Sequence, residues 1–266
     1  MNTDFFKPYA QRPIKILDID ARSPMFIPDL SLMGGLFVVD REWAQSQLPT
    51  KEYVPVQPMP GKALAAIHAL SYNATDIGPY NEVSISVPCA YASGLTQRLP
   101  LVSQLKWSLS GFRRVFSGFV LDLPVTTAAA VAGGVEWFNF PKYLADITFR
   151  ETATHRICTV RDIDTKDLIL EFEGRRIADN RLWGARIPEK LRSFDVMLLP
   201  RIKGASHKAR MKIQMDRFAM SAGFGAKVRF GDSPRASNYS GAIKGPITHY
   251  IYAPKCRGIL FEPEEI

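Results

Sequence analysis

The chain has very few cysteines and lacks any long apolar run. Its 266 residues include three cysteines, Cys89, Cys158 and Cys256, which lie far apart and form no CxxC pair. This usage excludes a disulfide framework and a cysteine-based zinc site, and it is typical of a reducing compartment. Residues 1–25 mix charges of both signs, and the weakly polar run 124–135 is too short to span a bilayer. We therefore predict a cytoplasmic protein with no signal peptide and no membrane span.

Motifs for nucleotides, metals and serine hydrolysis are also missing. The sequence contains no G-x-x-x-x-G-K-[ST], no H-E-x-x-H and no G-x-S-x-G, and Gly223-Phe224-Gly225 lacks the third glycine of a dinucleotide fingerprint. The four histidines, His68, His155, His207 and His249, have no metal-ligand spacing. We therefore expect neither a metal nor a cofactor. His68 is the most interesting of the four because it lies on an apolar strand.

The charge balance is basic, with a formal net charge of +8. The densest basic segment, residues 201–212, begins after an alternating apolar run at 194–198 and leads into another at 211–215. This pattern predicts a β-hairpin with a basic tip. A solvated tip accounts for the charge, and attraction of anionic substrates by a long-range field is the alternative. No recognisable nucleic-acid-binding module accompanies the charge, so we predict no nucleic-acid partner.

Most of the chain alternates apolar and polar residues with a period of two, which indicates strands. Only residues 41–48 and 126–133 favour helix, the first ending near Pro49 and the second near Gly133-Gly134. No linker or internal repeat divides the chain. The sequence predicts one mainly β domain over residues 1–266, an antiparallel β-barrel or cone with a few short helices. The expected strands are 36–39, 62–72, 80–87, 115–121, 143–149, 155–160, 168–172, 227–230, 247–252 and 257–261.

One lysine has unusual neighbours in the sequence. Lys142 directly follows Pro141 and lies close to Trp137, Phe138 and Phe140. Burial among aromatic side chains disfavours the ammonium form, so we expect a lowered pKa and more free amine near neutral pH. A neutral amine attacks ketones and forms a Schiff base, which accepts electrons during carbon–carbon chemistry. From local sequence alone, the alternative is an ordinary surface lysine after a turn proline.

The expected strand 80–87 carries a carboxylate at a position that alternation makes informative. Val83, Ile85 and Val87 share one face, whereas Glu82 shares the other face with two serines. If the apolar face packs beneath other elements, the polar face lines a cavity and Glu82 is placed to move protons. A solvent-facing glutamate on a half-exposed strand is the alternative.

These two segments resemble those of the acetoacetate decarboxylase family. Residues 134–142, G-V-E-W-F-N-F-P-K, are similar to the family's G-x-E-x-x-x-Y-P-K segment with Phe140 in place of Tyr, and Tyr80-Asn81-Glu82 is similar to its Tyr-x-Glu strand. The resemblance implies that Lys142 forms a Schiff base with a keto acid and that Glu82 lies in the active site. It also implies a largely antiparallel β-barrel or cone, assembly into homo-oligomers, and chemistry that needs no metal or pyridoxal cofactor.

The chain departs from the family at several active-site positions. The family's second lysine is Tyr143 here, so burial alone must lower the pKa of Lys142. A Tyr143→Lys substitution is accordingly expected to lower that pKa further and to speed any decarboxylation. The family's arginine and its earlier glutamate have no clear counterparts, because they align near Ser31 and near Ile67 or His68.

The residues and the resemblance together predict the following site. Lys142 is the nucleophile, Phe138, Phe140 and Tyr143 form an apolar substrate wall, and His68 also contacts substrate. The predicted function is that of an acetoacetate decarboxylase-like lyase acting on a β-keto acid. One alternative is a Schiff-base aldolase or dehydratase acting on pyruvate-like acids. The other is a barrel that only binds small molecules, with Lys142 as an ion-pair partner.

Overall fold

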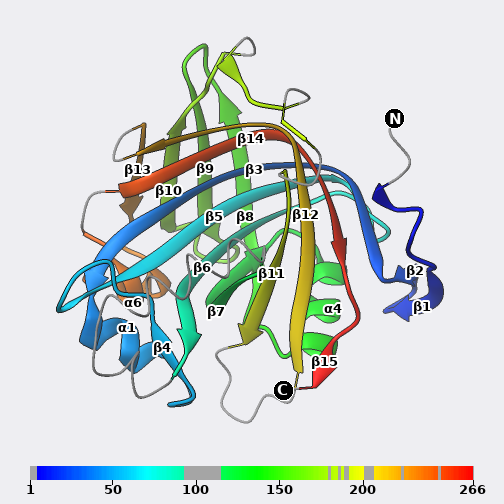
Figure 1. Ribbon diagram of the computed structural model, residues 1–266, viewed down its shortest axis with the longest axis horizontal. Helices are drawn as coiled ribbons and strands as arrows, with labels where there is room; N and C mark the ends of the chain where they lie inside the picture. The colour runs from blue at the N-terminus through cyan, green and yellow to red at the C-terminus, as the bar shows by residue number, and fades with distance from the viewer. Residues whose placement is uncertain are drawn as a thin grey trace.

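The protein is mainly β, as the sequence predicted (Figure 1). The computed structural model describes residues 5–92, 115–178, 181–184, 187–188, 192–200, 207–222, 225–244 and 247–265. No helix in these ranges has the length and apolar character of a membrane span. The elements are β1 (Arg12–Ile16), β2 (Ile19–Ser23), β3 (Met25–Asp40), α1 (Arg41–Gln47), β4 (Tyr53–Pro55), β5 (Lys62–Ala74), β6 (Tyr80–Tyr91), β7 (Val115–Val125), α4 (Ala128–Phe138), β8 (Lys142–Glu151), β9 (His155–Asp162), β10 (Leu168–Arg175), β11 (Ser193–Pro200), β12 (His207–Ala222), β13 (Ala226–Phe230), α6 (Pro234–Ser240), β14 (Ile247–Leu260) and β15 (Glu264–Glu265).

Seven strands form a closed ring. In the order β7–β11–β12–β14–β3–β5–β6 each strand pairs with the next, and β6 pairs with β7 to complete the barrel. β8, β9, β10 and β13 continue from β7 as a second arm of the sheet, and β1 and β2 form a separate hairpin. The predicted β-barrel with a few short helices is confirmed.

The sheet is mixed rather than purely antiparallel, which corrects the prediction. β7 pairs in parallel with β11 along its first half and with β8 at its end. Parallel neighbours need a long crossover connection, usually a helix. Between β7 and β8 that connection is α4, so the helix that the sequence predicted is also the reason that these two strands run the same way.

Both faces of β6 are buried, and alternation separates them as expected. Val83, Ile85 and Val87 pack in a hydrophobic cluster that includes Phe172 of β10, so the second arm of the sheet covers this face. Glu82 lies on the opposite face and is 7% exposed. The alternative of a solvent-facing glutamate is therefore wrong.

Helix α4 continues beyond the glycine pair at which the sequence predicted its end. Thr127 caps its start, because the Thr127 side chain accepts a hydrogen bond from the Ala130 backbone N–H. The helix then runs through Gly134 to Phe138 and is closed by Asn139, whose φ of 54° is left-handed. Gly133 and Gly134 therefore lie inside the helix rather than at its end. The packing of Lys142 against Gly134, described below, explains the use of glycine at residue 134.

Two strands are longer than the alternating pattern indicated. β3 covers Met25–Asp40 rather than residues 36–39, and β14 covers Ile247–Leu260 as one strand where two were expected. The pairing register shifts between Asp29 and Leu30 of β3, and between Ala253 and Cys256 of β14. Such irregularities move side chains from one face to the other, so a strict period of two ends at each of them.

The predicted hairpin around the basic segment is present as β11 and β12. Phe194 lies opposite Ile213 and Val196 opposite Met211, in an antiparallel register. The connection itself, residues 201–206, lies outside the described residues, whereas Lys208, Arg210 and Lys212 of the basic segment belong to β12. The prediction of a hairpin is confirmed, and its tip stays a prediction.

Candidate active site

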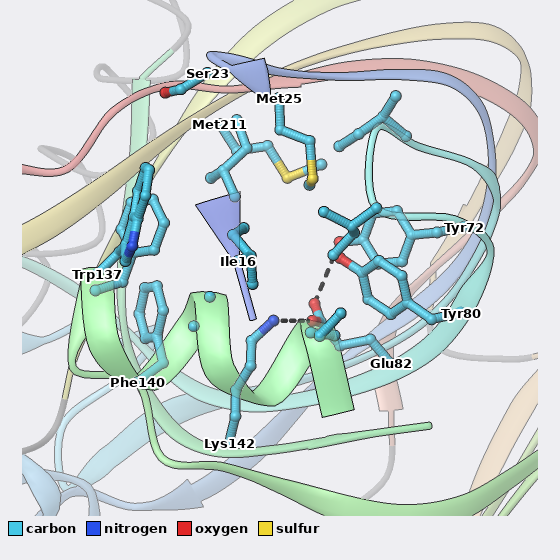
Figure 2. A pocket seen from close by; sticks show the side chains of 18 of the residues that line it. Ile16, Ser23, Met25, Tyr72, Tyr80, Glu82, Trp137, Phe140, Lys142 and Met211 are labelled. Atoms are coloured by element: carbon cyan, nitrogen blue, oxygen red, sulfur yellow. Dashed lines mark hydrogen bonds and ion pairs between the residues drawn. The ribbon is translucent and has the colours of Figure 1, made fainter. Parts of the chain in front are cut away.

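A cavity of about 80 Å³ lies within the ring of strands. Each of the seven ring strands contributes at least one lining residue. The others come from α4, the β1–β2 hairpin, the start of β8 and the residues Ile77, Phe140 and Phe261 outside these elements (Figure 2). Among the described lining residues the charged ones are Arg22, Glu82 and Lys142, so the wall is largely apolar, as in many small-ligand sites. Its apolar residues include Ile14, Ile16, Met25, Ile27, Leu123, Trp137, Phe138, Phe140, Leu198, Met211, Leu260 and Phe261.

Lys142 and Glu82, the two residues that the sequence singled out, meet in this cavity. Lys142 Nζ lies 2.8 Å from Glu82 Oε2, and the two side chains are only 10% and 9% exposed. Glu82 is on β6 and Lys142 begins β8, with β7 running between these strands. Glu82 is paired with Val125 of β7 and Lys142 with Leu123, two residues apart. Both side chains therefore emerge on the same face of β7.

The segment 134–142 folds so that the stem of Lys142 lies along α4. Past the helix end, the Phe140 N–H donates back to the Gly134 carbonyl at 3.1 Å, and Pro141 then leads the chain into β8. A Cβ on Gly134 would overlap the Cδ and Cε atoms of Lys142. Glycine is therefore needed at this helical position for the lysine to cross the helix and reach the carboxylate.

Two buried tyrosines complete the polar end of the cavity, and the sequence analysis assigned neither a role. Tyr72 on β5 donates its hydroxyl to Glu82 Oε1 at 3.2 Å, and its ring stacks on that of Tyr80 with centroids 4.4 Å apart. Lys142 Nζ lies 5.7 Å from the centroid of the Tyr80 ring. Burial raises the pKa of both phenols well above 10, so both stay protonated at neutral pH. Tyr80 shares the face of Glu82, and Tyr72 is its cross-strand partner, so alternation contained the signal for both.

Phe138 and Phe140 line the cavity as expected, with their rings stacked at a centroid distance of 5.8 Å. Tyr143 does not line it. Adjacent residues of a strand point to opposite sides, so Tyr143 faces away from Lys142 and donates its hydroxyl to Asp122 Oδ2 at 3.1 Å. The expected contact between Tyr143 and substrate therefore has no support in the structure, and neither does a cation at residue 143 acting on the neighbouring lysine.

His68 also lies outside the cavity lining. It is paired with Gly34 of β3 on one side and with Ser84 of β6 on the other, and a Cβ on Gly34 would overlap its ring. Burial lowers the pKa of His68 to about 4, so the imidazole is neutral at physiological pH. Packing against a glycine explains its place better than contact with substrate.

Arg22 is a second cation among the lining residues, although it is an exposed residue, and it was not predicted from the sequence. It lies on β2 beside Ser23, and both residues line the cavity. The positions aligned with the family's arginine and earlier glutamate, Ser31 and Ile67, do not line it. Within the described residues β2 pairs with β1, and each strand has five residues, so the alternation of apolar and polar residues was too short to predict this hairpin. In the described ranges no group of His, Cys, Asp and Glu side chains could hold a metal ion.

Solved structures share this fold. An acetoacetate decarboxylase from Legionella pneumophila is 14% identical, with a TM-score of 0.62 over 97% of this chain and 91% of that one. The enduracididine biosynthesis enzyme MppR, solved in complex with pyruvate, is 10% identical, with a TM-score of 0.52 over 90% of each chain. At these identities the likeness shows a common fold. No curated protein sequence matches the chain.

A family model gives the more specific result. The model described as Acetoacetate decarboxylase (ADC) matches residues 14–255. The matched region contains both Glu82 and Lys142 and all seven strands of the ring except the end of β14. The chain belongs to the acetoacetate decarboxylase family.

Proposed function

We propose that this protein is a lyase that forms a Schiff base between Lys142 and a small β-keto acid and then removes carbon dioxide from it. The observation that carries the proposal is the 2.8 Å contact between Lys142 Nζ and Glu82 Oε2 in a cavity with an apolar wall. An amine nucleophile needs a base within hydrogen-bond reach to take its proton, and Glu82 lies at that distance from Lys142.

The first step converts the ion pair into an imine. Glu82 takes a proton from the Lys142 ammonium, so an N–H bond breaks and an O–H bond forms at Oε2. The free amine adds to the keto carbon of the substrate. Glu82 returns its proton to the hydroxyl of this adduct, water leaves, and a protonated imine remains.

The second step uses the imine as an electron sink. The bond between the carboxylate and the adjacent carbon breaks, its electrons move toward the imine nitrogen, and carbon dioxide leaves an enamine. Glu82 takes up a proton from water and delivers it to the enamine carbon. Water then hydrolyses the imine, which releases the ketone and restores the Lys142 ammonium.

The size and lining of the cavity favour a small substrate with an apolar substituent. One water molecule occupies ~10–15 Å³ of a cavity, so a cavity of about 80 Å³ has room for roughly six waters. Acetoacetate is of this size. Met25 and Met211 both line the cavity (Figure 2), and their flexible side chains allow a somewhat longer substrate chain.

Borohydride trapping tests the proposal. The protein is incubated with acetoacetate, pyruvate and longer keto acids, reduced, and digested for peptide mass spectrometry. We expect a substrate-dependent adduct on Lys142, absent from Lys142→Ala and unchanged in Lys255→Ala, which alters an exposed lysine of β14. Carbon dioxide release is measured with the same acids. Binding without any adduct would instead identify a small-molecule-binding barrel in which Lys142 is only an ion-pair partner.

Aldol or dehydration chemistry on a pyruvate-like acid is the second candidate, and Arg22 is the observation that favours it. An α-keto acid keeps its carboxylate through the reaction and needs a lasting cation, whereas a β-keto acid loses its carboxylate as carbon dioxide. Arg22 is the one lining cation besides Lys142 among the described residues, and MppR was solved with pyruvate. Under this candidate, Arg22→Gln weakens trapping of pyruvate at least about tenfold, the loss expected for a charged hydrogen bond, with little effect on acetoacetate.

A further inference from the structure

The hydroxyl of Tyr72 is a buried polar group of the cavity that the steps above do not use. Tyr72 is 4% exposed, and its hydroxyl donates to Glu82 Oε1 at 3.2 Å. The other carboxylate oxygen, Oε2, lies 2.8 Å from Lys142 Nζ. Figure 2 shows the carboxylate between the phenol and the amine. Each oxygen of Glu82 therefore has its own partner.

Because each oxygen of Glu82 has its own partner, the orientation of the carboxylate is fixed. The last torsion of a glutamate side chain is broad, so a single contact leaves the plane of the carboxylate free to turn. The nitrogen of Lys142 has fewer hydrogens to donate as it changes from ammonium to amine to imine. The hydrogen bond from Tyr72 to Oε1 therefore keeps Oε2 near the nitrogen while the contact between Oε2 and Lys142 weakens.

The donor is itself held rigidly. The Tyr72 ring stacks on Tyr80 at a centroid distance of 4.4 Å and an interplanar angle of 22°. The two residues are direct cross-strand partners on β5 and β6, so the regular sheet fixes the stack. Burial raises the pKa of Tyr72 well above 10, which keeps the hydroxyl hydrogen available at neutral pH. A donor on a packed strand meets the requirement for a preorganised site.

We propose that Tyr72 is a positioning residue for the proton transfers of Glu82, holding Oε1 so that Oε2 stays at the reacting nitrogen and at the adjacent enamine carbon. The inference rests on the Schiff-base function proposed above. No bond to Tyr72 forms or breaks. Its O–H donates throughout, and the proton that moves passes between Oε2, the nitrogen of Lys142 and the substrate.

Tyr72→Phe tests this role because it removes the hydroxyl and keeps the ring that stacks on Tyr80. Borohydride trapping with acetoacetate reports imine formation. Exchange of acetone hydrogens for deuterium in D₂O, followed by NMR, reports enamine formation and protonation. We expect the variant to form the adduct to the wild-type extent, with KM changed less than about threefold. We expect its exchange rate and kcat to fall about 10-fold to 100-fold, in the range of a lost acid–base contribution.

Two further variants separate positioning from a structural effect. Tyr250→Phe makes the same change at a buried tyrosine outside the cavity, whose hydroxyl donates to the Arg175 carbonyl at 3.1 Å. It should lower the melting temperature and leave the exchange rate unchanged. In a Glu82→Gln background, Tyr72→Phe should cause no further loss of exchange, because the hydroxyl acts through that carboxylate.

The outcomes are distinguishable. If the wild type forms the adduct and Tyr72→Phe exchanges acetone hydrogens within about threefold of its rate, well inside the expected loss, the positioning role is overturned and the Schiff-base function stands. An additional loss in the Glu82→Gln background also overturns the role. No wild-type adduct with any keto acid overturns both proposals.

Discussion

Replacing Gly134 by alanine should disable the candidate nucleophile and leave the protein folded. The new Cβ would lie 2.6 Å from Lys142 Cε, whereas carbon atoms in contact stay about 3.5–4.0 Å apart. The lysine side chain must therefore move by roughly 1 Å. Because Lys142 Nζ lies 2.8 Å from Glu82 Oε2, a displacement of this size takes the pair beyond hydrogen-bond distance.

The expected effects on stability are small and opposed. Alanine stabilises a helix interior by roughly 0.5–1 kcal/mol relative to glycine, and losing a hydrogen bond to a charged group costs about 1.5–3 kcal/mol. We expect the free energy of unfolding to fall by roughly 0.5–2.5 kcal/mol. A misplacement of about 1 Å lowers a reaction rate on the order of 100-fold. Urea unfolding and the rate of borohydride-dependent adduct formation measure the two effects separately.

Gly133→Ala is the matched control, because it adds the same methyl group to the same helix. Its Cβ would lie 3.2 Å from Ile16 Cδ1, the end of a flexible side chain, and meets no atom of Lys142. This variant should keep most of the trapping rate. If Gly134→Ala traps keto acids within about threefold of the wild-type rate, far from the 100-fold loss expected for a misplaced group, the path of Lys142 across the helix does not position the amine and the reasoning is refuted.

Other predictions concern groups outside the cavity. The folded-state pKa of His68, about 4, lies below its ordinary value of 6.5. As the pH falls, the unfolded chain therefore binds a proton at His68 before the folded chain does. The free energy of unfolding should fall by up to about 1.4 kcal/mol per unit between pH 6.5 and 4, a slope that His68→Gln should reduce in urea titrations. Burial raises the pKa of Cys89 and Cys158 to about 12, so mass spectrometry should find iodoacetamide adducts at pH 8 only after unfolding. Tyr143→Lys should not speed decarboxylation, because residue 143 faces Asp122 rather than the cavity; a faster reaction would restore the neighbouring-cation account.

The sequence predicted strands best where apolar and polar residue types alternate along the chain. β6 starts at its expected residue, Tyr80, because its sequence alternates in this way, although both of its faces are buried. β1 and β2 have five residues each, so their alternation of apolar and polar residues was too short to predict strands. The first part of β3 was missed because Pro28, Asp29 and the Gly34-Gly35 pair are disfavoured in strands and because the pairing register shifts at Asp29/Leu30. Low β propensity and local irregularity both limited the prediction.

The candidate site was predictable only in the parts that neighbours in the sequence determine. Lys142 and Phe140 belong to one short segment, and alternation along β6 placed Glu82 on the face opposite the valines. Two other features of the site depend on strand order. β7 runs between β6 and β8, and Tyr72 of β5 contacts the carboxylate of Glu82. Strand order is a property of the whole fold, so no local pattern reveals these contacts.

Strand register also explains why Tyr143, the residue after Lys142, is partly buried on the other side of the sheet. β8 pairs with β7 over only three positions, Leu123 with Lys142, Pro124 with Tyr143 and Val125 with Leu144. A slip of one residue in so short a ladder would turn Lys142 away from Glu82. Tyr143 opposes such a slip, because its hydroxyl is bound to β7 itself through Asp122 and the Arg235 guanidinium lies 3.7 Å from its ring centroid. Tyr143, which was predicted to contact the substrate, instead stabilises the position of β8 from the face opposite the cavity. β8 is the strand that carries Lys142.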